Sequence, residues 1–220
     1  MAVTRFADRR AAGRALGKRL ADTNGGRDVV VLGLPRGGVI LAAEVAAALR
    51  APLDVLVVRK LGLPWQPELA MGAIAAAGDS VETVRVESVL LSARVTPDTF
   101  DRVRREELDE LRRRETAYRG DRPAVQLRGR AVVLVDDGLA TGATMRAAVV
   151  AVRQQAPLSV TVAVPIGSPT ACAALAPDVD EIVCLRAPSA FRAVGQGYAD
   201  FTATSDEEVR TALAGARSAV

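Results

Sequence analysis

The chain of 220 residues contains no histidine, and this absence excludes several kinds of functional site. A serine–histidine triad, a histidine-ligated metal and an imidazole general base all need that side chain. Aromatic residues make up only 3% of the chain, so an extended surface that stacks single-stranded nucleic-acid bases is not expected. Any catalytic site must therefore be built from carboxylates, cations, hydroxyl groups or the backbone.

Cysteine is scarce as well. The two cysteines, Cys172 and Cys184, form no CxxC pair and match no zinc-ligand spacing. We expect both to be buried, reduced and to act as small apolar residues. The segment 1–20 mixes charges through its apolar positions, unlike a signal peptide, and no apolar run approaches the ~20 residues of a membrane span. These features predict a cytoplasmic protein without a membrane partner.

The chain also lacks a large excess of either charge. It has 29 basic and 26 acidic side chains, which gives a net charge of +3. The charged segment 98–118 interleaves both signs, as expected for a solvated helix with ion pairs between neighbouring turns. Nucleic acid is therefore not an expected partner.

Short apolar runs alternate with helical patterns along the chain. Strands are predicted at 29–34, 53–58, 131–137, 159–167 and 180–186, and helices at 6–23, 39–50, 98–118, 141–155, 168–176 and 206–214. This alternation predicts an α/β fold with a mostly parallel, five-stranded sheet and helices on both faces. We expect a single domain over 1–220, with a core at about 25–186, a flap near 59–95 and a small C-terminal hood at about 187–220.

Three local patterns organise the predicted flap. The stretch LGLPWQPEL, residues 61–69, contains two prolines and is predicted to be a loop. The runs 71–77 and 81–86 are predicted to form a β-hairpin around Gly78 and Asp79. Thr96 is predicted to cap the helix that follows, because proline and then an acid occupy its first positions.

Three of the predicted strands end in residues with unusual chemistry. These are LPRGG at 34–38, the cations Arg59 and Lys60, and the acids Asp136 and Asp137 with the loop 140–144 behind them. Ligands of parallel sheets bind beyond the carboxyl ends of the strands. Glycines permit close backbone approach, and an arginine can bind a phosphate through two hydrogen bonds.

The two acids and the loop behind them suit different parts of one ligand. Thr141–Thr144 would begin a helix, where free amides and hydroxyl groups favour a phosphate. The carboxylates would repel that phosphate, and they suit hydroxyl groups or Mg²⁺. A ligand with a phosphate, a diol and a metal-bound anionic group would satisfy every part. Neither a GxxxxGK[ST] loop nor a GxGxxG turn after the first strand offers a rival phosphate site.

These residues carry a resemblance to a known family. VVLVDDGLATGAT, residues 132–144, resembles the phosphoribosyl-pyrophosphate motif of the type I phosphoribosyltransferases, and LPRGG is similar to their pyrophosphate loop. The resemblance implies that family's Rossmann-like fold, a homodimer, and an enzyme in which a nucleobase or other small nucleophile displaces pyrophosphate. It also implies a peptide between Pro35 and Arg36 that is strained, and cis in relatives.

The resemblance further implies roles for individual residues. Asp136 and Asp137 would hold the ribose hydroxyls and the Mg²⁺ cofactor, and Arg36 and Lys60 would join them as catalytic residues. The remaining substrate-binding residues would be Pro35, Gly37, Arg59, Ala140, Thr141, Gly142, Ala143, Thr144 and Phe191. Purely structural roles stay open for the charged residues: the acids could simply end a strand, Arg36 could pair at the helix start, and Arg59 and Lys60 could be surface charges.

The acceptor is the least defined part of this interpretation. Purine-salvage relatives commonly carry an acid at the position of Ala140, so their usual general base is missing. Phe191 is the candidate that would stack on a base, with Tyr198 and Asp200 beside it, although these residues could equally pack the tail onto the sheet. Within the flap, Glu68 is the most suggestive acid, and Trp65 could close over the ligand or anchor the loop.

Two other functions stay open beside the transferase. The chain could be a non-catalytic or regulatory relative that binds a nucleotide or phosphoribosyl pyrophosphate, with RNA as one target. It could also only hydrolyse phosphoribosyl pyrophosphate. Salt-dependent RNA binding without turnover would favour the regulatory function.

Overall fold

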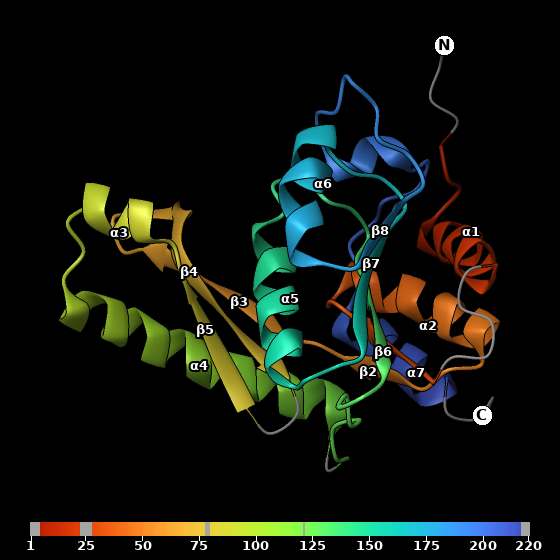
Figure 1. Cartoon of the computed structure of the whole chain (residues 1–220), viewed down its shortest axis with the longest axis horizontal. Helices are drawn as coiled ribbons and strands as arrows, with labels where there is room; N and C mark the ends of the chain where they lie inside the picture. Colours follow the sequence, from red (N-terminus) through yellow and green to blue (C-terminus); the bar gives the residue numbers. More distant parts are fainter. Residues whose placement is uncertain (1–4, 23–27, 78–79, 121, 217–220) are drawn as a thin grey trace.

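A five-stranded parallel sheet forms the core of the chain in a computed structural model that describes residues 5–22, 28–77, 80–120 and 122–216 (Figure 1). The strand order is β2-β1-β6-β7-β8, and every neighbouring pair is parallel. The strands are β1 (Val29–Gly33), β2 (Leu53–Val55), β6 (Ala131–Val135), β7 (Ser159–Val164) and β8 (Glu181–Cys184). The predicted fold class is confirmed.

Helices cover both faces of this core sheet (Figure 1). Val31 and Val133 pack with α1 (Arg9–Ala21) and α2 (Gly37–Leu49) on one face. Val30 and Val132 pack with α5 (Ala143–Gln154) and α6 (Pro169–Leu175) on the other. Successive side chains of a strand point to opposite faces, so a sheet covered on both sides needs continuous apolar strands. The β-branched runs of the sequence meet this need.

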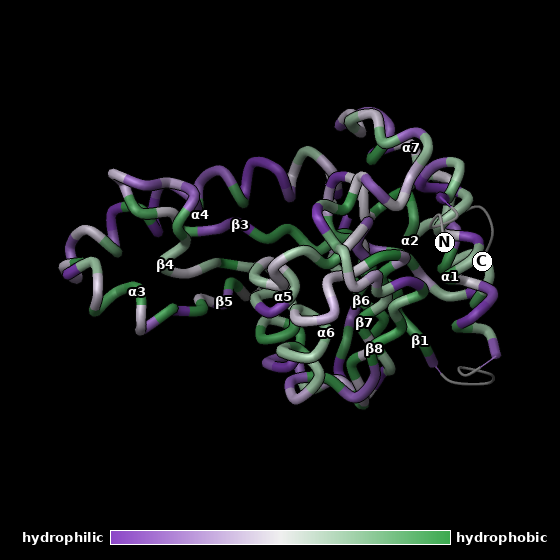
Figure 2. The backbone as a smooth tube through the Cα atoms, turned by 90° about the horizontal axis from the view of Figure 1, so that it is seen from above, coloured by the Kyte–Doolittle hydropathy of each residue, from purple (hydrophilic) through white to green (hydrophobic). Residues whose placement is uncertain are grey.

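A second sheet projects to one side of the core, and we call residues 58–119 the arm (Figure 1). Its antiparallel strands are β3 (Val58–Leu63), β4 (Gln66–Ala77) and β5 (Ser80–Arg85), followed by α3 (Glu87–Ser92) and α4 (Pro97–Arg119). As predicted, Thr96 caps α4: its hydroxyl accepts a hydrogen bond from the Thr99 amide at 3.2 Å. Much of α4 is hydrophilic (Figure 2), as its charged sequence requires. The arm lies where the flap was expected.

Two predictions about the start of the arm are wrong. The apolar run 53–58 is not one strand, because β2 ends at Val55 and Val58 begins β3 in the other sheet. The stretch 61–69 is not a loop, because only Pro64 and Trp65 form a turn between β3 and β4. Pro67 is tolerated there since β4 pairs with β5 only from Gly72 onward, which leaves one edge of β4 free at the proline.

The remaining elements agree with the expected pattern. The hairpin predicted for 71–77 and 81–86 is formed by β4 and β5, and its turn at Gly78 and Asp79 lies outside the described residues. The C-terminal segment contains a short 3-10 helix at Val194–Gly197 and α7 (Asp206–Gly215), and another 3-10 turn at Ala176–Asp178 follows α6. No helix in the described parts of the chain combines the length and apolar character that crossing a membrane requires.

Candidate functional site

The loops that follow β1 and β6 meet at the carboxyl edge of the core sheet. Gly33 pairs with Val135, and the Leu34 amide donates a hydrogen bond to the Val135 carbonyl at 2.9 Å. A Cβ atom built on Gly37 would lie 2.0 Å from Oδ2 of Asp137. Because any side chain there would collide with the acid, glycine is required for this approach. The two sequence motifs are therefore parts of one site.

The peptide bond between Pro35 and Arg36 is cis, in agreement with the family resemblance. Arg36 follows it as the N-cap residue of α2 and is exposed. Among the described residues, no hydrogen bond or ion pair engages the Arg36 guanidinium. The cation is thus available to an anionic ligand at the edge of the site.

The two acids each have one oxygen engaged by the protein. Oδ1 of Asp136 accepts a hydrogen bond from the Asp137 amide at 2.8 Å. Oδ2 of Asp137 accepts a hydrogen bond from Nε of Arg9 at 3.0 Å, and Nη2 of the same guanidinium completes the ion pair at 2.9 Å. Within the described part of the chain, nothing donates a hydrogen bond to Oδ2 of Asp136 or Oδ1 of Asp137. The pair therefore retains two carboxylate oxygens that can accept hydrogen bonds from a ligand.

Arg9, which the sequence did not suggest, fixes the position of Asp137. It comes from the start of α1, and its Nη1 donates to the Thr202 carbonyl at 2.6 Å. Its guanidinium carbon lies 4.0 Å from the centre of the Phe201 ring. The side chains of Arg9 and Asp137 are only 12% and 19% exposed, so solvent screens this ion pair weakly. Arg9 joins the N-terminal helix, the acid and the C-terminal hood.

Burial raises the pKa of both acids. It raises the pKa of Asp136 well above the usual range, and the negative charge of Asp137 raises it further. Burial also raises the pKa of Asp137, while the neighbouring Arg9 guanidinium acts in the opposite direction. A ligand that brings hydroxyl donors or positive charge to the pair would favour its ionised form.

The loop behind the acids presents backbone groups to solvent. Leu139 anchors it: its amide donates to the Ile166 carbonyl at 2.9 Å, and its carbonyl accepts from the Ser168 amide at 2.8 Å. Gly142 has φ +79°, a left-handed conformation that glycine adopts without strain. The helix α5 begins directly after it, and no side-chain hydrogen bond caps that end. Amides at such a helix start favour a phosphate.

The rest of the predicted phosphate loop lies around this helix start. Ala140, Thr141 and Ala143 are exposed, and Thr144 is half-buried in the first turn of α5. The Thr141 hydroxyl is 3.5 Å from the Ala143 amide, at the limit of a hydrogen bond. The predicted phosphate-binding residues are therefore gathered beside the two acids.

The acids do not form a metal site by themselves. Across residues 5–22, 28–77, 80–120 and 122–216, no group of three or more His, Cys, Asp or Glu side chains could hold a metal ion. Mg²⁺ is usually held by one or two carboxylates together with substrate phosphates and water. Asp136 and Asp137 fit such a shared site, with a bound substrate supplying the other oxygens.

The two cations predicted to complete the site lie inside β3 of the arm, not at a strand end. Arg59 forms an ion pair with Glu107 of α4, with Nε and Nη2 both 2.6 Å from Oε2. Lys60 is exposed, and as the next residue of the strand it lies on the opposite face of β3. No hydrogen bond or ion pair in the described ranges connects either cation to the loops around Asp136.

The aromatic residues of the hood pack against the core. Phe191 is half-buried against the core cluster on the α1 and α2 side. Tyr198 is buried between Phe6 and Phe201, and its hydroxyl donates to the Asp137 carbonyl at 2.6 Å. Burial raises the pKa of this phenol, so it stays a donor. Tyr198 therefore helps to hold the backbone of Asp137 in place.

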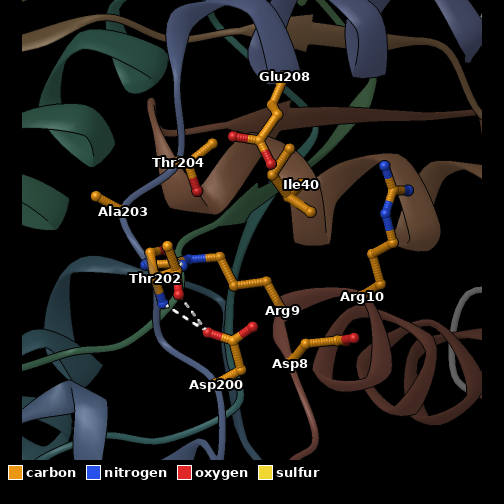
Figure 3. Close-up of a pocket in the computed structure, with 9 residues that line it drawn as sticks. All are labelled: Asp8, Arg9, Arg10, Ile40, Asp200, Thr202, Ala203, Thr204 and Glu208. Carbon is orange, nitrogen blue, oxygen red and sulfur yellow. Dashed lines mark hydrogen bonds between the residues drawn. The ribbon is translucent and has the colours of Figure 1, made fainter.

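A polar cavity of about 240 Å³ opens beside Arg9 (Figure 3). Figure 3 shows the Arg9 side chain reaching toward Thr202, while Asp200 hydrogen-bonds to Thr202 next to it. The other lining residues are Asp8, Arg10, Ile40, Ala203, Thr204 and Glu208.

The flap residues singled out from the sequence lie elsewhere: Trp65 is 61% exposed at the β3–β4 turn, and Glu68 is exposed on β4.

Comparison with known proteins shows the family of this chain. Residues 4–198 match the phosphoribosyl transferase domain family. Since the match covers most of the chain, the protein belongs to this family. The parallel sheet with helices on both faces agrees with the fold that the family resemblance implies.

Individual relatives agree with this assignment. Two proteins of Mycobacterium tuberculosis, named "Putative phosphoribosyl transferase MT0597" and "Putative phosphoribosyl transferase Rv0571c", are each 52% identical over 204 residues. The alignments cover 93% of this chain but 45% of each relative, so the chain spans about half the length of these relatives. The crystal structure of TT1426 from Thermus thermophilus has 45% identity and a TM-score of 0.82, and the match covers 96% of this chain and 98% of that one.

Proposed function

We propose that this protein binds phosphoribosyl pyrophosphate at the carboxyl edge of the core sheet and transfers the phosphoribosyl group to a small nucleophile, releasing pyrophosphate. One observation supports this most strongly. The loop 34–38, which we call the glycine loop, lies against the acidic pair. Each acid keeps one carboxylate oxygen available to a ligand: Oδ2 of Asp136 and Oδ1 of Asp137. Two neighbouring hydroxyl groups of a ribose need two such acceptors.

The 5-phosphate would bind at the N-terminus of α5, which follows the acids in the chain. The Thr144 amide and the Thr141 hydroxyl would donate to it, and the Ala143 amide would exchange its 3.5 Å contact with Thr141 for the phosphate. The left-handed Gly142 lets the chain turn toward the ligand, and Ala140 adds no charge that would repel the phosphate. The acids and the amides would thus bind opposite ends of the same sugar.

The pyrophosphate group would bind beside the cis peptide between Pro35 and Arg36. Arg36 would stabilise its charge as the bond to carbon 1 breaks, while Pro35 and Gly37 shape the loop against it. Lys60 would add positive charge from the arm, whereas Arg59, on the opposite face of β3, stays paired with Glu107. The reacting carbon would have oxocarbenium character, and closure of the arm would keep water away from it.

Asp136 and Asp137 would hold Mg²⁺ together with substrate oxygens, and the bound ion would offset the negative charge of pyrophosphate as it leaves. A cytoplasmic homodimer is the state that we expect from the family resemblance and from the cysteine content. The chain has alanine where purine-salvage relatives carry an acid, so the acceptor could be a nucleobase or another small nucleophile, such as an amine.

Calorimetry with phosphoribosyl pyrophosphate and Mg²⁺ tests the binding step. We expect the Asp137→Asn variant to bind at least about tenfold more weakly, because the ribose loses a charged acceptor. The matched control is Asp109→Asn, which removes an exposed acid of α4. Equal affinity of the wild type and Asp137→Asn would contradict the proposed ribose site.

A pyrophosphate-release screen with a panel of nucleobases and small amines tests the transfer step. Release that depends on one acceptor class would support the transferase and identify that class. Release without any acceptor would mean hydrolysis of phosphoribosyl pyrophosphate. Salt-dependent RNA binding with no release at all would favour a regulatory relative.

A further inference from the structure

The two cysteines of the chain lie side by side beneath the loop that joins β7 to α6. Cys172 belongs to α6, and Cys184 is the last residue of β8. A Cβ atom built on Gly167 would lie 2.9 Å from the sulfur of Cys172 and 3.2 Å from that of Cys184. The lack of a side chain at Gly167 therefore leaves room for both sulfurs at one point.

The Cys172 thiol also affects the ionisation of Cys184. Burial raises the pKa of Cys184 to about 12, and the neighbouring Cys172 thiol contributes to this rise. Cys184 in turn donates to the Arg186 carbonyl at 3.2 Å. Both cysteines are half-buried, so a small reagent can reach them. Both cysteines are free and pack against the apolar core as expected, but they are half-buried rather than fully buried.

Oxidation suits this pair better than metal binding. The full chain contains two cysteines and no histidine. No third Cys, Asp or Glu ligand joins the pair in the portions of the chain that the structure describes, so a closed metal site is lacking. Two neighbouring thiols with no competing cysteine can form only one intramolecular disulfide.

The pair is connected to the proposed phosphate loop through short contacts. Gly167, which touches both sulfurs, would also place a Cβ atom 3.3 Å from Cβ of Leu139. Leu139 is held by hydrogen bonds to Ile166 and Ser168, on either side of Gly167. Gly167 therefore lies between the two sulfurs and Leu139, the residue that anchors the loop 140–144.

We propose that Cys172 and Cys184 are a redox-active dithiol that closes to a reversible intramolecular disulfide, and that the disulfide weakens phosphoribosyl-pyrophosphate binding by displacing Leu139 and the loop behind it. The effect on binding rests on the proposed function, whereas the formation of the disulfide does not.

The oxidant in this proposal is a low-molecular-weight disulfide such as oxidised glutathione. The Cys172 thiolate attacks one glutathione sulfur, which forms a mixed disulfide and releases one reduced glutathione. The Cys184 thiolate then attacks the Cys172 sulfur and releases the second. The protein loses two protons and two electrons, and these reduce the reagent to two thiols. Cys172 attacks first because the Cys184 thiol is held by its hydrogen bond to the Arg186 carbonyl at 3.2 Å, and burial raises its pKa.

Mass spectrometry after oxidation, alkylation and tryptic digestion tests the modification itself. Residues 154–186 contain no lysine or arginine before Arg186, so one peptide carries both cysteines. We expect the oxidised wild type to give this peptide unalkylated and two hydrogens lighter, and a reducing agent should restore alkylation at both positions. Alkylation of both cysteines after oxidation would overturn the proposal.

Single variants test the order of attack. Cys184→Ser should retain one glutathione on Cys172, because the second attack is missing. Cys172→Ser should take up none. The reverse pattern, with glutathione on Cys184 and none on Cys172, would overturn the assigned order.

Calorimetry on reduced and oxidised protein tests the coupling to the site. We expect the disulfide to weaken phosphoribosyl-pyrophosphate binding about fivefold or more, and the double variant Cys172→Ser/Cys184→Ser to be unaffected by the oxidant. An unchanged affinity of the oxidised wild type would overturn the coupling. If the reduced protein does not bind the compound at all, the proposed function fails, while the disulfide is still judged by its mass.

Discussion

The core and the arm present their candidate site residues in different ways. In the core, the loop after β1 and the acids after β6 emerge at one edge because the two strands are paired in register. In the arm, Arg59 and Lys60 lie within β3, and their side chains leave opposite faces of the strand. A residue that directly follows a strand can be placed at the sheet edge from the sequence alone. A residue inside a strand can be placed only when the neighbouring strands and their register are known. The core should therefore account for most of the function.

The largest effect is expected at the glycine loop of the core. Arg36→Ala should slow pyrophosphate release by an amount equivalent to about 2–4 kcal/mol of barrier, because a preorganised positive charge is lost. The melting temperature should change little, since Arg36 is exposed and has no hydrogen bond or ion pair within the described residues. Rate assays beside thermal melts separate the two effects. Arg112→Ala, at another exposed arginine, should leave the rate unchanged.

Removal of Arg9 should affect stability and binding together. Arg9→Ala breaks a mostly buried ion pair with Asp137 and the contact with Phe201, which should lower the free energy of unfolding by about 3 kcal/mol. It should also weaken phosphoribosyl-pyrophosphate binding, because Asp137 is no longer held in place. Arg10→Ala, which removes an exposed pair with Glu44, should cost less than about 1 kcal/mol. Denaturant unfolding that gives equal losses for the two variants would contradict the role of Arg9.

Asp136→Asn should move stability and affinity in opposite directions. The raised pKa of Asp136 in the folded protein means that its neutral form favours folding at low pH, and that this stability is lost as the pH rises through the raised pKa. Asparagine is neutral at every pH and can still accept the Asp137 amide. At pH 8 the melting temperature of the variant should therefore rise by about 2–4 °C for each ~1 kcal/mol gained in the free energy of unfolding. Its affinity for phosphoribosyl pyrophosphate should fall about tenfold. Lower stability with unchanged affinity would rule out this interpretation.

The smallest effects are expected in the arm, and they should differ between its two cations. Lys60→Ala should slow pyrophosphate release more than Arg59→Ala, because Lys60 is exposed whereas Arg59 is paired with Glu107. Arg59→Ala should instead loosen the contact between β3 and α4 and lower the melting temperature slightly. Steady-state kinetics and thermal melts on both variants test this. A larger rate loss for Arg59→Ala would place the guanidinium, not the amine, beside the pyrophosphate.

The sequence predicted the core of the site because its signals are local. Asp136, Asp137 and the loop behind them follow directly on a buried strand, so their position depends on that one strand alone. Arg9 could not be found this way. It is separated from Asp137 by 128 residues, and it is one of several arginines on an amphipathic helix. The contact depends on how α1 packs, which no local pattern encodes.

Contacts between elements account for the wrong predictions in the arm and for the unforeseen proximity of the two cysteines. Leu61 and Leu63 are both buried, and this period-two spacing was a usable strand signal, but the neighbouring prolines suggested a loop. The partner of Arg59 is on α4, and the partner of Cys172 is on a strand of the core sheet. Each of these depends on contacts between elements, and a single sequence does not reveal them.

A crystal structure of the protein with phosphoribosyl pyrophosphate and magnesium would show whether the acidic pair and the loop behind it hold the sugar. We expect ribose hydroxyls on Oδ2 of Asp136 and Oδ1 of Asp137, with the 5-phosphate on the amides of 141–144 and Arg9 still bound to Oδ2 of Asp137. A compound seated elsewhere, with both of those oxygens facing water, would contradict it.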